Sequence, residues 1–114
     1  MKCDLASFAS VRDFCKQVDR EEKKVDILVN NAAAFSTTRV ETEDGQEMVF
    51  QVNHLSHFLL TNLLLDKMKA AKAARIINVS SLGHWLVITH NHLDPPLRFI
   101  LTIIGRLFGF PGRT

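Results

Sequence analysis

Two short stretches decide the fold, Val25-Asp26-Ile27-Leu28-Val29-Asn30 and Arg75-Ile76-Ile77-Asn78-Val79-Ser80. Both are mostly apolar and rich in β-branched residues, which is typical of buried parallel strands. Each ends at a turn signal, Asn30-Asn31 in the first and Ser80-Ser81-Leu82-Gly83 in the second. Because parallel neighbours need a long crossover connection, the residues between them should hold a helix. We therefore expect an α/β fold with one clear βαβ unit.

Two helices are expected beside these strands. Residues 42–72 carry apolar side chains at helical spacing, and Thr42 offers a capping hydroxyl that is followed by two acids in the first turn. Residues 7–22 show the same spacing, with Ser7 or Ser10 as the capping residue. One expected helix precedes the first strand in the sequence and the other follows it, which agrees with the α/β class.

The composition is that of one small globular domain. Of its 114 residues 46% are hydrophobic, and the net charge of +2 is too weak, with no block of like charges, to predict nucleic-acid binding. Cys3 and Cys15 are expected to be reduced, partly buried thiols. No secretory signal and no apolar run of about 18 residues is found, so we expect a cytoplasmic or peripherally membrane-associated protein.

Four local patterns, in this order, resemble the short-chain dehydrogenase/reductase family, and within it the retinol dehydrogenase branch. They are Cys3-Asp4-Leu5 before a helix, Asn30-Asn31-Ala32-Ala33 after a strand, Val52-Asn53-His54-Leu55-Ser56-His57-Phe58 inside the long helix, and Ile77-Asn78-Val79-Ser80-Ser81 at a strand end. The resemblance covers about residues 2–84 and implies a Rossmann-like, doubly wound parallel sheet that binds NADP. Residues 1–84 are thus expected to be the central portion of such a domain, truncated at both ends.

The resemblance also implies site residues. Asp4, Leu5, Asn31, Ala32 and Ala33 match positions that contact the cofactor, with Asp4 accepting from the adenine amino group.

Two further matches are catalytic. Ser81 matches the hydroxyl that donates to the developing oxyanion while a carbonyl is reduced, and Asn53 matches the asparagine that holds a water near the active-site lysine. The 114 residues contain no tyrosine and no lysine after Lys72, so the Tyr-x-x-x-Lys proton donor is missing, and so is the glycine-rich phosphate loop. We therefore expect the chain to be inactive in this form.

Three details remain open. Ala33 stands where the family has glycine, which would cost about 1–2 kcal/mol if the position needs a positive φ. Ser56 also replaces a glycine, which is tolerable if the packing has room. The histidines, among them His54 and His57, lack the further ligands of a zinc site, so we expect no metal.

The tail, residues 85–114, matches no family motif. Within it residues 97–110 have the spacing of an apolar helix with a thin polar, basic stripe. This segment could lie in a membrane interface, pack on the sheet, or come from alternative splicing or a gene-model join and not be selected to pack. Three functions follow: an inactive form of an NADP-dependent oxidoreductase acting on retinol, retinal or another alcohol or carbonyl; an interaction module that self-associates or pairs with full-length relatives; and a protein of membrane surfaces.

Overall fold

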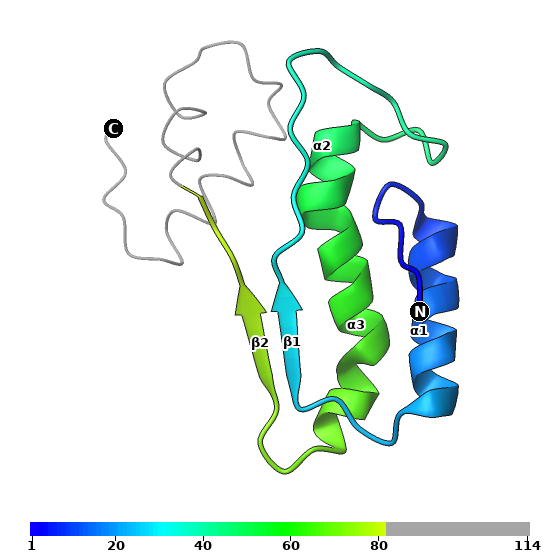
Figure 1. Ribbon diagram of the computed structural model, residues 1–114, viewed down its shortest axis with the longest axis vertical. Coiled ribbons are helices and arrows are strands. Elements are labelled where there is room, and N and C mark those ends of the chain that lie inside the picture. The colour runs from blue at the N-terminus through cyan, green and yellow to red at the C-terminus, as the bar shows by residue number, and fades with distance from the viewer. Residues whose placement is uncertain (82–114) are drawn as a thin grey trace. The chain divides into compact units, whose positions relative to one another are not determined.

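The computed structural model describes residues 1–81, and the elements follow one another as the βαβ prediction requires (Figure 1). The chain divides into two compact units after Val79, and the described part of the second consists of Ser80 and Ser81. The predicted boundary at 84/85 and the predicted helix at 97–110 lie outside the described residues. The elements are α1 (Phe8–Glu21), β1 (Ile27–Asn30), α2 (Met48–Phe50), the π-helical segment η1 (Gln51–Leu55), α3 (Ser56–Lys69) and β2 (Arg75–Asn78).

The two strands pair in parallel, as predicted. Ile27 lies opposite Arg75, and the register runs to Asn30 opposite Asn78. The pairing continues past both strand ends, because the Arg75 N–H donates to the Asp26 carbonyl at 2.9 Å and the Val79 N–H to the Asn30 carbonyl at 3.0 Å. Both strands are shorter than their apolar stretches, so the apolar pattern predicts their position better than their ends.

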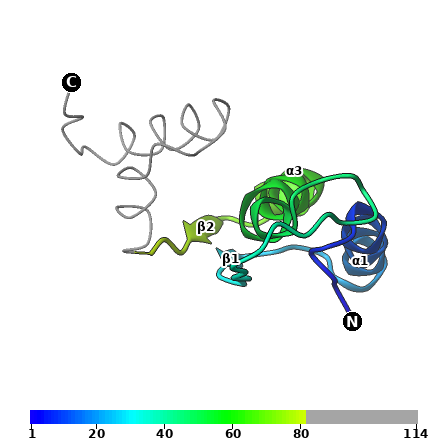
Figure 2. The same ribbon diagram turned by 90° about the horizontal axis from the view of Figure 1, so that it is seen from above.

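The helices α1 and α3 lie on the same side of the sheet (Figure 2). Their facing side chains form the core, which consists of Val11, Cys15, Val18, Leu60 and Leu64, with Leu28 of β1 packed against it. The α/β class and the parallel strands are therefore confirmed. A doubly wound sheet needs helices on both faces, and the described residues supply them on one, so that part of the fold class stays a prediction.

The other face of the sheet is apolar and open to solvent. Side chains alternate along a strand, so Ile27 and Val29 of β1 point away from the helix side that Leu28 faces. Their exposed fractions are 59% and 52%, and those of Ile77 and Val79 are 45% and 54%. Ile76 pairs with Leu28 and therefore faces the helix side, but it is 42% exposed, so the helices cover that face at β1 and not at β2.

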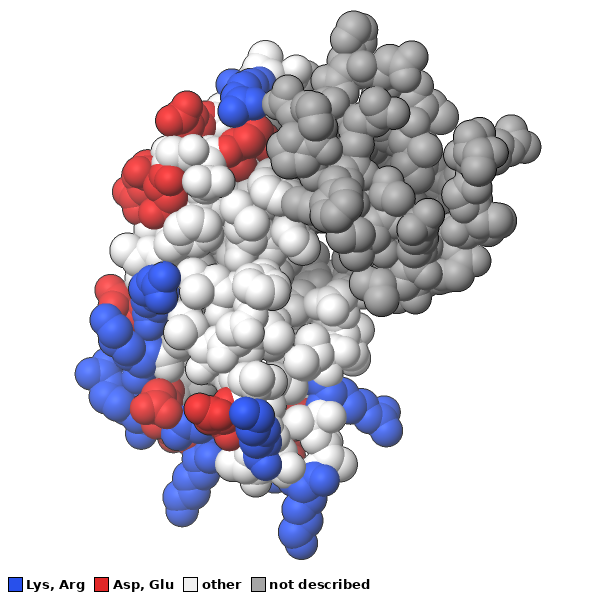
Figure 3. Space-filling model, turned by 180° about the vertical axis from the view of Figure 1, so that it is seen from behind, with Lys and Arg blue, Asp and Glu red and all other residues white. Residues whose placement is uncertain are grey.

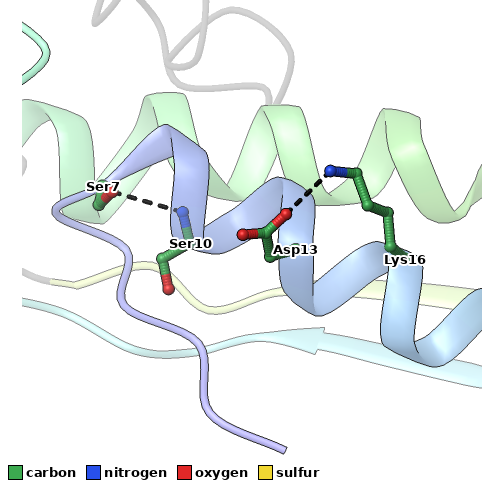
Figure 4. Close-up of polar contacts among 4 residues, drawn as sticks. All are labelled: Ser7, Ser10, Asp13 and Lys16. Atoms are coloured by element: carbon green, nitrogen blue, oxygen red, sulfur yellow. Dashed lines mark hydrogen bonds and ion pairs between the residues drawn. The ribbon is translucent and has the colours of Figure 1, made fainter.

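The first helix begins where the sequence predicts. Ser7 has extended backbone angles, and its hydroxyl accepts from the Ser10 N–H at 3.3 Å, so Ser7 is the N-cap and Ser10 is not (Figure 4). One turn further along, Lys16 pairs with Asp13 at 2.9 Å. Both partners of that pair are exposed, so it contributes little to stability.

The predicted start of the long helix at Thr42 is wrong. The Gly45 N–H donates to the Thr42 carbonyl at 3.0 Å, and Gly45 has a φ of +71°, so these residues form a turn. The helix begins at Met48 instead, where both carboxylate oxygens of Glu47 accept from the first N–H groups, those of Val49 and Phe50. It ends at Lys69 and not at 72.

The acids of this turn lie at the N-terminus of α1 and not at that of the long helix. Asp44 Oδ2 accepts from the Phe8 N–H at 2.8 Å and from Nε2 of Gln51 at 2.6 Å, and Glu43 accepts from the Ser7 hydroxyl. α1 has no acid in its own first turn, so this turn supplies the negative charge that a helix N-terminus favours. The hydrogen bonds join α1 to the long helix.

Charged side chains are unevenly distributed on the described surface. Figure 3 shows Lys and Arg at the lower end of the molecule and an uncharged area in the middle of the face shown. At the lower end Lys67, at the C-terminal end of α3, reaches Asp19 of α1 at 3.0 Å, which ties the two helices together. Within residues 1–81 no helix has the length and apolar character needed to cross a membrane.

Candidate functional site

The predicted site residues of the first unit gather at the carboxyl end of β1. Asn31, Ala32 and Ala33 follow the strand directly and are exposed. Among the described residues every positive φ belongs to glycine, so Ala33 does not adopt the strained conformation considered above. Alanine therefore replaces the family's glycine without a backbone penalty.

Asn53 holds this loop in place. Its Oδ1 accepts from the Ala34 N–H at 2.7 Å, and its Nδ2 donates to the Ala34 carbonyl at 2.9 Å. A primary amide that satisfies both backbone groups of one residue fixes the position and the direction of the chain there. The side chain of Asn53 thus orients the loop, a contact that the sequence alone did not predict.

The helix around Asn53 is locally wider than an α-helix. Five residues, Gln51–Leu55, form η1, and the Ser56 N–H donates to the Gln51 carbonyl, five positions back. The Asn53 carbonyl faces Nδ1 of His57 at 3.2 Å. Single turns of π-helix within α-helices occur often at functional sites, which agrees with the contact between η1 and the loop.

Asp4 and Leu5 lie in the turn before α1. Oδ1 of Asp4 accepts from the Ala6 N–H and the Asp4 N–H donates to the Ser10 hydroxyl, both at 2.9 Å. The Leu5 carbonyl accepts from the Ser56 hydroxyl at 2.6 Å, and Ser56 is fully buried. The hydroxyl that replaces the family's glycine therefore joins the N-terminal turn to the long helix.

A groove connects these two groups of predicted site residues. It has a volume of about 220 Å³ and contains both Leu5 and Ala32 in its wall. Most of its lining is apolar, and the other residues that line it are Cys3, Phe14, Val29, Asn30, His57 and Leu60. Asp4 is exposed and lies between the lining residues Cys3 and Leu5 in the sequence.

Asn30, the last residue of β1, is a buried polar residue that lines the groove. It is 5% exposed, and its Nδ2 donates to Oδ1 of Asn78 at 2.8 Å and to the Thr61 hydroxyl at 3.0 Å, so it joins both strands to α3. Its Oδ1 is buried without a hydrogen-bond partner among the described residues. Because side chains alternate along β1, Asn30 lies on the same side as Leu28, which is the side of the helices.

Two cysteines and one histidine have shifted pKa values, and of these Cys3 lines the groove. Burial, and then the charge of Cys3, raises the pKa of the Cys15 thiol to about 11, and burial, then Asp4, raises that of Cys3. Burial, and then His57, lowers the pKa of His54, whose ring stacks on Phe50 with centroids 5.4 Å apart. All three shifts favour the neutral form of the side chain.

The comparison with protein families decides the identity. The model of the short chain dehydrogenase family matches residues 1–87, which is most of the chain and includes all four motifs. The chain belongs to the short chain dehydrogenase family.

Within this family the chain is similar to retinol dehydrogenases. It is 60% identical to retinol dehydrogenase 13 of Mus musculus over 83 residues, which are 73% of this chain and 25% of that protein. It is 55% identical to retinol dehydrogenase 14 of Homo sapiens over 78 residues, 68% of this chain and 23% of that protein. The match thus spans about a quarter of the length of these relatives.

Solved structures of the same fold include proteins with a bound nicotinamide cofactor. The Pseudomonas aeruginosa RhlG/NADP active-site complex has a TM-score of 0.61 and 26% identity, covering 94% of this chain and 43% of that one. The NADPH-bound carbonyl reductase from chicken fatty liver has a TM-score of 0.61 at 20% identity, over 92% and 47% of the two chains, a likeness that shows the fold alone.

One predicted catalytic residue of this dehydrogenase family member belongs to the second unit. Ser81 is exposed and follows the carboxyl end of β2 in the sequence. The structure thus brings the predicted cofactor residues together around β1 and η1, whereas the role of Ser81 stays a prediction.

Proposed function

We propose that this chain is the central part of an NADP-dependent oxidoreductase that interconverts retinol and retinal, or another alcohol and carbonyl. The observation that supports this most is the pair of hydrogen bonds between Asn53 and Ala34, since it orients the loop that carries the predicted cofactor contacts. The similarity to retinol dehydrogenases supports the substrate class. Because the chain spans about a quarter of those proteins, we assign the complete activity to a longer protein or assembly.

The described residues fit the adenine end of the cofactor. Leu5 and Ala32 line one groove, where an adenine ring could lie between apolar side chains. Asp4, the neighbour of Leu5 in the chain, is exposed, and the family resemblance assigns its carboxylate as the acceptor for the exocyclic amine. The described residues do not fit the pyrophosphate, because residues 1–81 contain one glycine, Gly45, which lies in the turn before α2. We therefore expect weak binding that depends on the adenine ring.

The chemistry that the cofactor supplies when bound is hydride transfer. Ser81 would donate its hydroxyl proton in a hydrogen bond to the carbonyl oxygen as negative charge develops there. A proton donor must complete the reaction, and the 114 residues contain no tyrosine to do so. We infer that the chain alone has no reductase activity, and that Ser81→Ala changes no measurable rate of retinal-dependent NADPH oxidation. A rate that this substitution abolishes would refute the inference.

Titration with adenosine and with NADPH, followed by amide NMR, tests the binding part of the proposal. We expect both ligands to shift the amides of Leu5 and Ala32 with dissociation constants of about a millimolar, since the phosphate site is missing. Asn53→Leu should weaken both titrations because it releases Ala34, whereas Asn62→Leu on the exposed side of α3 should leave them unchanged. Micromolar affinity for NADPH, or no shift at Leu5 and Ala32, would contradict the proposal.

A further inference from the structure

Asp4 is held at the start of α1 through both its backbone and its side chain. Its N–H donates to the Ser10 hydroxyl at 2.9 Å, its carbonyl accepts from the Ser7 N–H at 3.3 Å, and its Oδ1 accepts from the Ala6 N–H at 2.9 Å. Asp4 itself is exposed, so a ligand can reach the carboxylate. The direction of this side chain is thus restricted although the residue lies on the surface.

The contact with Ser10 is the one that local geometry does not require. An aspartate that accepts from the N–H two residues later, as Asp4 does from Ala6, forms a common turn. Ser10 is the third residue of α1, a position from which the side chain of a capping box reaches back to the N–H of the N-cap residue. Its hydroxyl instead accepts from the Asp4 N–H, while its own N–H donates to the hydroxyl of the N-cap, Ser7 (Figure 4). Ser10 therefore joins Asp4 to the capped end of the helix.

The part of α1 that carries Ser10 is itself well packed. Val11, the residue after Ser10, is fully buried in the core between α1 and α3. The residue after Asp4 is fixed as well, because the Leu5 carbonyl accepts from the buried Ser56 hydroxyl at 2.6 Å. α3 therefore holds Leu5, which lines the groove, and α1 holds the residue directly before it.

We propose that Ser10 is a positioning residue, which holds Asp4 so that its carboxylate selects adenine over purines that lack the exocyclic amine. This inference rests on the proposed function, in which Asp4 accepts from that amine. Ser10 acts through Asp4 and does not itself contact the nucleotide. An exposed carboxylate on a loose turn must be ordered when the ligand binds, and this cost offsets most of the hydrogen bond that it makes. A turn that is fixed in advance avoids the cost, so the hydrogen bond contributes to affinity.

The selectivity can be measured with two nucleosides that differ at one position. Adenosine carries the exocyclic amine, and purine riboside has a hydrogen in its place. Each is titrated into the 114-residue chain, and the amide shifts of Leu5 and Ala32 give the dissociation constants. We expect adenosine to bind about fivefold more tightly, which is the effect of one hydrogen bond at a solvent-accessible site. Asp4→Ala should bind both nucleosides with equal affinity.

Ser10→Ala should remove the preference for adenosine. The substitution takes away the acceptor of the Asp4 N–H, while alanine keeps the helix intact. Adenosine should then bind about fivefold more weakly than to the unchanged chain, and purine riboside should bind as before, so the preference falls below about twofold. Ser10→Thr keeps a hydroxyl at the same position and should retain the preference.

Ala9→Gly is the matched control for the stability of α1. Ala9 is exposed and lies in the same turn as Ser10, and glycine there weakens the helix without removing a hydrogen-bonding side chain. A general loss of structure would weaken the binding of both nucleosides alike, so Ala9→Gly should keep the preference for adenosine. A second readout needs no ligand. The NMR signal of the Asp4 amide proton should move upfield in Ser10→Ala, because its hydrogen bond is lost, and should stay in place in Ala9→Gly.

The outcomes separate the role of Ser10 from the adenine site itself. A preference for adenosine that survives in Ser10→Ala, or that Ala9→Gly loses to the same extent, would overturn the role of Ser10 and leave the adenine site standing. Equal binding of the two nucleosides to the unchanged chain, or no shift at Leu5 and Ala32, would overturn the adenine site and the role of Ser10 together.

Discussion

The two faces of the small sheet differ in almost every respect that matters for stability. On the helix side Leu28 packs against a core from α1 and α3, and the polar groups beside it, except Oδ1 of Asn30, are hydrogen-bonded. On the other side Ile27, Val29, Ile77 and Val79 are about half exposed. The difference indicates that the helix pair and the inner face of β1 form a core, while the other face of the sheet is left uncovered by the described residues.

The largest expected effect tests the difference between the two faces directly. Leu64 is 3% exposed, and Leu64→Ala should lower the free energy of unfolding by about 2–5 kcal/mol, because it leaves a cavity between α1 and α3. Val79 is 54% exposed, and Val79→Ala should lower it by less than about 1 kcal/mol. Urea unfolding followed by circular dichroism measures both. Equal losses would mean that the second face is covered in solution.

A second substitution tests whether the polar contacts at the N-terminus of α1 stabilise the helix side of the structure. Asp44→Ala leaves the Phe8 N–H and the buried Nε2 of Gln51 without their acceptor, so the free energy of unfolding should fall by about 1–3 kcal/mol. Asp44→Asn keeps one acceptor oxygen and should lose less. Glu22→Ala, an exposed C-cap residue of α1, is the control and should change stability little. A negligible loss for Asp44→Ala would show that this turn does not support α1.

Ser56 tests the contact between the long helix and the N-terminal turn. Ser56→Ala removes the hydroxyl that donates to the Leu5 carbonyl and should cost about 1 kcal/mol. Ser56→Gly, the residue of the family pattern, should cost about 1 kcal/mol more, since glycine adds backbone entropy in a helix. Urea unfolding, together with the NMR shift of the Leu5 carbonyl carbon, separates loss of this bond from general destabilisation. An unchanged Leu5 shift in Ser56→Ala would contradict the assignment.

The smallest expected effect is on pH dependence. The pKa of His54 lies below its usual 6.5 in the folded chain, because burial disfavours the charged ring. The unfolded chain therefore binds more protons between the lowered pKa and 6.5. The contribution of neutral His54 to the free energy of unfolding is fully present above that window and is lost as pH falls through it. His54→Phe keeps a ring beside Phe50 and should flatten the pH dependence of urea unfolding between pH 7.5 and about 5. A stability that rises as pH falls would contradict the direction of the shift.

The strands and the first helix could be predicted because their signals are local. Apolar runs of the right length and the capping serine before α1 depend on neighbouring residues alone, and the structure confirms both. The start of the long helix was mispredicted for a physical reason. Thr42, Glu43 and Asp44 look like the cap of the helix that follows, but they stabilise α1, which comes earlier in the chain.

The contacts of the candidate site were less predictable than its residues. The family resemblance indicated Asn53 and the loop after β1, but no pattern showed that Asn53 binds Ala34 or that Ser56 binds Leu5. The burial of Asn30 was not predicted because an asparagine at the end of a strand looks like a turn residue. Its burial depends on packing against Thr61 of α3, which is 31 positions away in the sequence.

The π-helical segment changes the direction in which side chains point along the long helix. An α-helix advances by about 100° per residue, so one extra residue within η1 rotates everything after it relative to α2 by about that angle. Gln51 can therefore face Asp44 while Ser56 faces Leu5, although both side chains lie on one continuous helix. Deleting a single residue from η1 should convert the segment to ordinary α-helix. The hydrogen bonds of Gln51 to Asp44 and of Ser56 to Leu5 could then not both form. A chain engineered by insertion or deletion should thus tolerate length changes in the exposed turn after α3 far better than a change of one residue in η1.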